Sequence, residues 1–172
     1  MLTKNDIVEY QLMTQEKLNK EFYIACNYGN LELVKFLLTS QELKQHAIID
    51  SDNNAGFKLA CICGNLNIIR YLVTSPELEK NVNVHVHNDI CFKWALDLEF
   101  IEIINFLVYE QDIKVTNEMI EHMNEQTIEN SNDLEKLILI SKVEKMLEIK
   151  NFKNKLSGQL ILKEENKVLK KI

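Results

Sequence analysis

A seventeen-residue segment occurs three times in this chain, at intervals of 35 residues. The copies are FYIACNYGNLELVKFLL at 22–38, FKLACICGNLNIIRYLV at 57–73 and FKWALDLEFIEIINFLV at 92–108. The second copy is identical to the first at seven of its seventeen positions and conservatively related at six more. A fixed period of this length predicts stacked structural repeats. Such a stack offers an extended surface, which suits the binding of another macromolecule better than the turnover of a small one.

Apolar residues inside each copy follow the spacing of helices. In the second half they recur at positions i, i+3, i+6 and i+7, starting from Leu31, Leu66 and Ile101, as expected for an amphipathic helix. The first half carries small residues on its packed side, such as Ala25 and Cys26, and these let a neighbouring repeat approach closely. Each copy is therefore predicted to be a pair of helices.

A glycine-asparagine pair separates the two halves in the first two copies, at Gly29 and at Gly64. Glycine readily takes the left-handed conformation that ends one helix and turns the chain into the next. The third copy has Glu99 at this position, where a residue other than glycine costs on the order of 1 kcal/mol. We therefore expect this turn to be either reshaped or mildly strained. The segment does not return after Val108, so the array is predicted to end there.

The linkers between the copies are also related to each other. TSQELKQHAIIDSDNN at 39–54 and TSPELEKNVNVHVHND at 74–89 share the opening TS-EL, and Asn53 corresponds to Asn88. The only proline, Pro76, lies in the second linker, where it interrupts no helix. Residues 83–88 alternate polar and apolar side chains, a spacing typical of extended chain. We predict a short extended finger here rather than a third helix.

These features together resemble ankyrin repeats over about residues 15–110. The pattern AC-x-x-GNL-x-[IL]-[IV]-[KR]-[FY]-L is similar to that family's AA-x-x-GH-x-x-[IV]-V-x-x-L core. Two departures are the absence of the family's Thr-Pro-Leu-His opening and a period of 35 residues in place of about 33. The resemblance implies an all-α fold: an ankyrin-type helical-repeat solenoid with N- and C-terminal helical caps.

The chain is predicted to divide into four parts. Residues 1–20 form N-terminal capping helices, 21–110 hold the three repeats, 111–152 form a C-terminal helical cap, and 153–172 are a basic tail. Terminal helices of this kind close the apolar ends of a stack. The nine Lys and four Glu of residues 142–172 give this end a net charge of +5, which leaves −11 on the first 141 residues from the total of −6.

Four cysteines raise the question of a disulfide or a metal site. Cys26 and Cys61 occupy the same place in successive copies, so stacked helices hold them roughly 10 Å apart, which is too far for a disulfide. We expect all four cysteines, including Cys63 and Cys91, to be reduced and mostly buried thiols.

The sequence offers little for catalysis. Its four glycines form none of the phosphate-binding or nucleophile-elbow motifs. His85, His87 and Cys91 fall within seven residues, but a zinc site is expected to have paired ligand spacing and a fourth ligand. No base with an orienting acid accompanies Cys63 or Cys91. We predict no catalytic residue, no metal site and no cofactor.

Partner-binding positions can be carried over from the ankyrin-repeat resemblance, which implies contacts on the concave face of the array. Tyr28 and Ile62 are the expected apolar anchors, and three aspartates are expected to form an acidic rim that favours a basic partner. The full set consists of Asn27, Tyr28, Ser51, Asp52, Asn54, Ile62, Cys63, Val86, His87, Asp89, Asp97 and Leu98.

Two functions from different classes follow. The first is a non-catalytic interaction protein that binds another protein on the concave face. The second is an ankyrin targeting module with a C-terminal helical effector or oligomerisation element, as in a bacterial or viral effector that acts on a cellular protein, with a homo-oligomer formed through the C-terminal helix. We expect no nucleic-acid partner, because the net charge is negative, and no membrane partner, because no long apolar run occurs. Both functions place the protein in the cytoplasm, of its own cell or of a host cell.

Overall fold

The computed structural model describes residues 2–111 and 113, together with eight helical residues between 141 and 156. The eight are Ser141, Val143, Lys145, Glu148, Ile149, Phe152, Lys155 and Leu156. The chain divides into two compact units, Met1–Ile113 and Lys114–Ile172. Most of the predicted C-terminal cap and tail, residues 111–172, lies outside the described residues.

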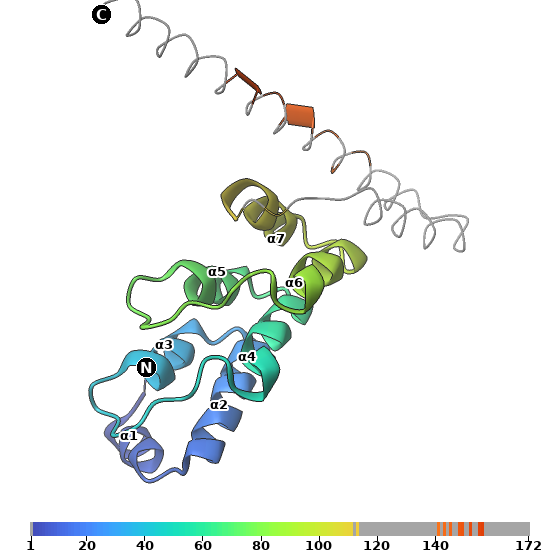
Figure 1. Cartoon of the computed structure of the whole chain (residues 1–172). Coiled ribbons are helices and arrows are strands. Elements are labelled where there is room, and N and C mark those ends of the chain that lie inside the picture. Colours follow the sequence, from blue (N-terminus) through green and yellow to red (C-terminus); the bar gives the residue numbers. More distant parts are fainter. Residues whose placement is uncertain are drawn as a thin grey trace, which may run out of the picture. The chain divides into compact units, whose positions relative to one another are not determined.

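The first unit consists of helices joined by turns and two long linkers (Figure 1). No strand occurs in its described residues, and the fold is all-α. In chain order the elements are α1 (Lys4–Gln11), α2 (Gln15–Tyr28), α3 (Leu31–Thr39), α4 (Ser51–Ile62), α5 (Leu66–Thr74), α6 (Val86–Asp97), α7 (Ile101–Asn105) and the π-helix η1 (Phe106–Glu110).

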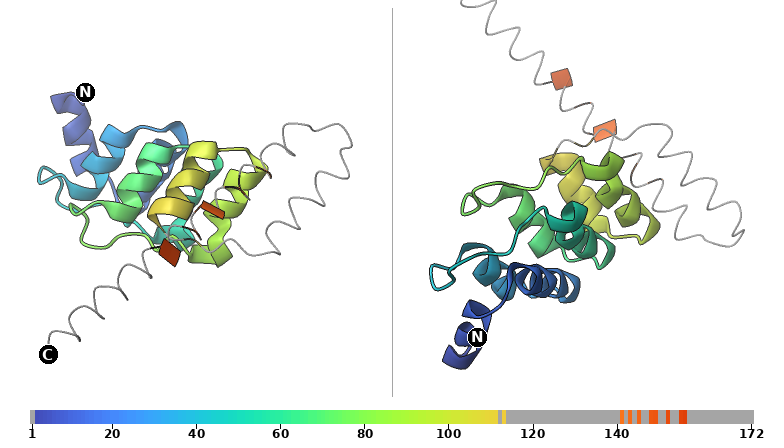
Figure 2. Two further views of the ribbon diagram at one scale, coloured as in Figure 1. Left: turned by 90° about the horizontal axis from the view of Figure 1, so that it is seen from above. Right: turned by 60° about the horizontal axis from the view of Figure 1, so that its bottom comes forward.

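The helices form three pairs that stack in the order of the chain. Each sequence copy makes one pair: α2 with α3, α4 with α5, and α6 with α7 and η1. Within the stack α2 packs against α4 and α4 against α6, while α3 packs against α5, so the first helices make an inner row and the second helices an outer row. Figure 2 shows the pairs following one another from the first repeat to the third. The predicted helix-turn-helix repeats are confirmed.

The core is built from the positions that the copies share. Phe22, Phe57 and Phe92 are all fully buried and lie at matching places on α2, α4 and α6. The two central positions of the predicted apolar stripe, i+3 and i+6, are also buried in all three second helices, with Val34, Leu37, Ile69, Leu72, Ile104 and Leu107 at zero exposure. Burial of each such side chain contributes about 1.5–3 kcal/mol, so the periodic residues explain most of the cohesion between repeats.

All three turns between paired helices use the left-handed conformation. The φ angles are 74° at Gly29, 73° at Gly64 and 59° at Glu99. The turn at Glu99 is therefore strained rather than reshaped, because the stack needs the same turn geometry in each repeat. Asn65 links the first two turns, since its side-chain amide donates to the carbonyls of Cys26 and Asn27 at 2.7 and 3.0 Å.

The prediction of an extended finger at residues 83–88 is wrong. His87, Asn88 and Asp89, and likewise Asp52–Asn54, are consecutive residues with φ between 46° and 61°. Each triplet makes a left-handed turn directly before the regular part of α6 or α4. Asn, Asp and His adopt this conformation more readily than other residues with a side chain, and the short polar groups of Asn and Asp bond locally. The Asn, Asp and His residues of the triplets therefore determine the backbone conformation here, and the alternating pattern does not.

The two linkers nevertheless share one structure. His46 Nε2 lies 2.9 Å from the carbonyl oxygen of Ser40, and the Asn81 amide donates to that of Ser75 at 3.0 Å. These pairs are 35 residues apart, so the period seen in the helices extends through the linkers.

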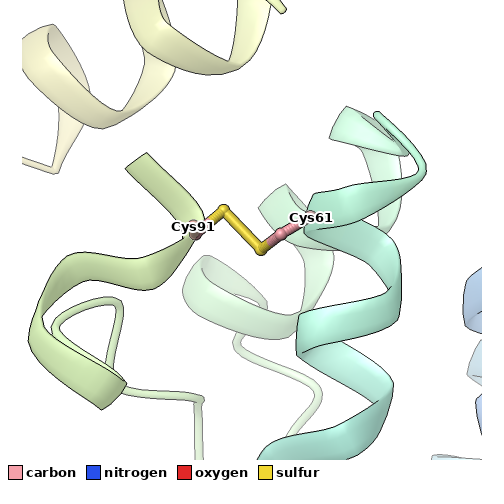
Figure 3. The surroundings of a disulfide bond; sticks show 2 residues. All are labelled: Cys61 and Cys91. Carbon is pink, nitrogen blue, oxygen red and sulfur yellow. A yellow bond between two sulfur atoms is a disulfide. The ribbon is translucent and has the colours of Figure 1, made fainter. Parts of the chain in front are cut away.

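The expectation of four reduced cysteines is also wrong. Cys61 on α4 and Cys91 on α6 form a disulfide, with their Cα atoms 5.2 Å apart (Figure 3). The expectation considered only the distance between cysteines that hold the same position in neighbouring copies, such as Cys26 and Cys61. Cys91 instead corresponds to Gly56, so the bonded pair is 30 residues apart. Cys26 and Cys63 are free, the first buried and the second exposed.

Candidate partner-binding face

Six of the predicted binding residues lie where the inner helices end. Asn27 and Tyr28 close α2, Ile62 and Cys63 close α4, and Asp97 and Leu98 close α6. We call these six residues the inner-end row. Because the inner helices pack side by side, their C-terminal ends occur as neighbours along the stack.

The inner-end row exposes three large apolar side chains. The Tyr28 side chain is 80% exposed, Ile62 is 43% exposed and Leu98 is 44% exposed. The free thiol of Cys63 is exposed as well and donates to Asn27 Oδ1 at 3.2 Å. This bond joins the first and second repeats, so the row is continuous across at least that interface.

The row also contains sources of negative charge. Each helix C-terminus carries a partial negative charge from carbonyl groups without a helical partner, and three of them lie here. The exposed carboxylate of Asp97 adds a full charge at the end of α6. A surface of exposed apolar groups beside helix C-termini and a carboxylate is suited to a partner that presents both apolar and cationic side chains.

The other six predicted residues lie at the opposite ends of the inner helices. Three lie at the start of α4 and three at the start of α6, in or beside the left-handed turns. Asp52 and His87 are exposed, whereas Ser51, Asn54, Val86 and Asp89 are partly buried. The regular part of α4 after its turn, residues 55–62, spans about 12 Å at 1.5 Å per residue. The sequence-predicted residues therefore form two groups rather than one.

Polar residues of this second group mostly hold the linkers in place. The Tyr23 hydroxyl lies 2.7 Å from Ser51 Oγ and 2.8 Å from a carboxylate oxygen of Asp52. Burial raises the pKa of Tyr23, and the Asp52 carboxylate adds to this increase, so the phenol remains a hydrogen-bond donor at neutral pH. Tyr23 contacts two of the predicted residues and was missed, because it is not among the family's contact positions.

The histidines of the second linker have structural partners. His85 Nδ1 lies 2.7 Å from an Asp89 carboxylate oxygen, and His87 Nε2 lies 3.1 Å from the carbonyl oxygen of Asn53. The sulfur of Cys91, the third member of that motif, is bonded to Cys61. Within the described part of the chain no group of three or more His, Cys, Asp or Glu is placed to hold a metal ion. No helix among those residues is long and apolar enough to cross a membrane.

Comparison with known proteins agrees with the repeat geometry. A family model described as ankyrin repeats, in three copies, matches residues 22–118, which is more than half of the chain. No curated protein and no solved structure matches the chain.

Proposed function

The chain belongs to the ankyrin-repeat family, whose repeats are protein–protein interaction modules, and from this premise we propose that its inner-end row captures another protein without catalysis. The observation that supports this proposal most strongly is the exposure of Tyr28, Ile62 and Leu98 at matching ends of three successive helices. Clustered apolar side chains on a soluble surface mark interaction sites. Tyr is also enriched among the residues that dominate binding energy.

The partner is proposed to be basic. The inner-end row combines three helix C-termini with Asp97, and the first 141 residues carry a net charge of −11. Such a surface attracts cationic side chains and repels acidic ones. The left-handed turns, with Asp52 and His87, give the partner a second line of polar contacts at the other end of the same helices.

Photo-crosslinking tests the proposed surface directly. A photoreactive phenylalanine derivative is placed at Tyr28 or Leu98 of the full chain, and at Val8 as a matched control, because Val8 is an apolar residue on α1 whose exposure, 53%, lies between theirs. We expect both inner-end positions to crosslink the same protein in the native lysate and Val8 not to do so. Equal labelling from all three positions would contradict the proposal.

A variant series gives the energetic test. The triple substitution Tyr28→Ser, Ile62→Ser and Leu98→Ser is expected to abolish capture and to leave the unfolding midpoint nearly unchanged, because all three side chains are exposed. The control is Val8→Ser with Leu12→Ser, which removes exposed apolar groups outside the row. Capture that survives the triple substitution would exclude the inner-end row as the binding surface.

The alternative function rests on an observation in the second unit. Ile149, Phe152 and Leu156 are helical and exposed at 44%, 67% and 48%, and they are spaced i, i+3 and i+7. This spacing is typical of a seam between paired helices. The alternative proposal is that the second unit joins two copies of the chain.

The oligomeric state distinguishes the alternative from the first proposal. Light scattering of the full chain at several concentrations is expected to show a dimer if the seam pairs with itself. Phe152→Glu should then give a monomer, whereas Phe152→Leu, which keeps an apolar side chain in the seam, should not. A monomer at all concentrations would remove self-pairing from consideration and leave partner capture by the inner-end row unaffected.

A further inference from the structure

A groove of about 550 Å³ lies at the end of the stack where the first repeat begins. It is lined by Leu2, Asn30, Glu32, Leu33 and Phe36, the last three of which belong to α3. The short helix α1 lies at this end of the stack (Figure 2), but none of its residues is buried. The end of the array is therefore only partly covered, and the groove is separate from the inner-end row.

The groove exposes the surface through which the outer helices stack. Leu33 and Phe36 are only partly buried in the first repeat. The residues at the matching positions of the later repeats are almost fully covered, with exposures of 1% at Ile68, 8% at Tyr71, and 1% at both Ile103 and Phe106. The difference arises because α3 packs against α5 and α5 contacts η1, whereas within the described residues no outer helix precedes α3.

A basic side chain covers the aromatic ring at both of the later positions. The ammonium group of Lys35 lies 5.5 Å from the centre of the Tyr71 ring, and the guanidinium carbon of Arg70 lies 4.5 Å from that of Phe106. The two cations are 35 residues apart, and so are the two rings. This cation–π contact is therefore a repeated part of the stack, and Phe36 is the first ring of the series.

Phe36 has an aromatic neighbour where the later rings have a cation. The centre of the Tyr10 ring lies 5.6 Å from that of Phe36, but Tyr10 does not line the groove. Tyr10 therefore leaves uncovered the part of Phe36 that borders the groove. The exposed carboxylate of Glu32 also lies at the groove, and its negative charge favours a cation near the ring.

The outer helices also indicate which residue accompanies the cation. Leu38 follows Lys35 by three positions, and Val73 follows Arg70 by three. Both apolar residues are partly buried, and residues three apart lie on the same face of a helix. A helix that repeats the stacking contact at the groove therefore carries a basic residue and, three positions later, Leu or Val.

We propose that this groove binds an amphipathic helix of a protein partner. Its Lys or Arg lies over the Phe36 ring beside Glu32, and its Leu or Val packs against Leu33, as in other complexes of a helix in an apolar groove. The site goes beyond the proposed function, because it uses a different surface. Val8 and Leu12 do not line the groove, so they remain valid controls for the inner-end row.

The test uses an alanine-rich helical peptide that carries one Lys and, three residues later, one Leu. The matched control peptide has Glu in place of the Lys. Each is titrated into the full chain, and methyl NMR signals are followed. We expect Leu2 and Leu33 to shift with the Lys peptide at millimolar concentration. The Glu peptide should bind at least about fivefold more weakly, because it loses the cation–π contact and meets Glu32. Equal binding of both peptides, no shift at all, or shifts centred on Ile62 and Leu98 would overturn the proposal.

Two variants assign the binding to the groove. Phe36→Leu keeps an apolar side chain without the ring and is expected to weaken binding of the Lys peptide at least about fivefold. Glu32→Gln should weaken it by a smaller factor, and this substitution of an exposed residue leaves the fold intact. The control is Glu102→Gln, since Glu102 is exposed at the matching position of the third repeat and does not line the groove. A loss in the control as large as in Glu32→Gln would refute the site.

The same signals detect a second copy of the chain in the groove. Shifts of Leu2 and Leu33 that follow the protein concentration without any peptide would show self-association at this end, and they would overturn the proposal of a partner helix. Neither outcome affects the crosslinking test at Tyr28 and Leu98, so this proposal and the proposed function fail separately.

Discussion

Glycine positions show how a single residue sets the geometry of this stack. Gly29 and Gly64 adopt positive φ, and a Cβ atom on Gly64 would lie 2.9 Å from the Phe100 ring. Phe100 therefore packs directly on the turn at Gly64. Asn65, which holds the matching position in the second repeat, bonds the turn at Gly29. Glu99 has the same conformation without the freedom of glycine, which makes it the weakest of the three turns.

Replacing Glu99 with glycine is expected to stabilise the protein. Release of the left-handed strain gains about 1–2 kcal/mol, and the added freedom of glycine in the unfolded chain costs about 0.5–1 kcal/mol, so the net gain is about 0.5–1 kcal/mol. Urea unfolding of the full chain measures it. The matched substitution Gly64→Ala should destabilise, and a Glu99→Gly protein no more stable than the natural one would show that the turn is unstrained.

The two free cysteines should differ sharply in reactivity. Cys26 is fully buried, and burial raises the pKa of its thiol far above the normal range, whereas Cys63 is exposed. Only the thiolate reacts with iodoacetamide. Mass mapping of the folded protein after alkylation should find Cys63 modified and Cys26 intact until the chain is unfolded. Comparable labelling of both in the folded state would contradict the packing of α2 against α4.

At the scale of whole elements, the helices were predictable and the linkers were not. Periodic apolar residues fix a helix locally, so copies of one segment gave the same pair three times. The linker at residues 83–88 has an alternating pattern that both a strand and an irregular chain satisfy, and only its Asn, Asp and His content signals left-handed turns. The partner-binding residues stay a prediction carried over from the family resemblance, and their division between the two ends of the inner helices needed the helix lengths.

The third repeat ends in a π-helix that is held from the second. Arg70 on α5 makes two hydrogen bonds to the Glu110 carboxylate and lies 4.5 Å from the centre of the buried Phe106 ring. We expect Arg70→Ala to cost about 1 kcal/mol, because it removes the cation–π contact and uncovers the ring. Glu110→Gln should cost distinctly less, since an exposed ion pair contributes little. Thermal unfolding compares the two, and equal losses would mean that the ion pair rather than the ring contact holds η1.

The same pair predicts a direction for the effect of pH. The bonds to Arg70 lower the pKa of Glu110 below its usual value. Its contribution is therefore complete above the usual glutamate range and is lost as the pH falls through the lowered pKa. In acid titrations the natural protein should approach the stability of Glu110→Gln at low pH. A difference between them that stays constant as the pH falls would be inconsistent with this ion pair.

The molecule as a whole combines an array predicted for the cytoplasm with a disulfide between its second and third repeats. The disulfide escaped prediction because neighbouring inner helices touch through positions 30 residues apart, whereas the repeat compares positions 35 apart. Cytosolic thiol systems keep most cysteines reduced, and structural disulfides persist in oxidising compartments. Whether Cys61 and Cys91 are bonded therefore depends on whether the protein resides in a reducing or an oxidising compartment.

The disulfide is expected to be the largest single contribution to the stability of the third repeat. Closing a loop of about 30 residues stabilises a protein by about 3–4 kcal/mol in the chain-entropy model. Cys61→Ala with Cys91→Ala should lower the free energy of unfolding by roughly this amount, less any strain in the native bond. Cys63→Ala should have a much smaller effect, because it removes only the exposed thiol's hydrogen bond to Asn27. The natural protein treated with a reductant should match the double variant. Two results together would show that the repeats are joined by packing alone. Reductant would leave the unfolding midpoint of the natural protein unchanged, and the unreduced, unfolded chain would titrate four thiols rather than two. The protein is then suited to a reducing cytoplasm; a count of two thiols in protein isolated from its native compartment would instead place it where disulfides persist.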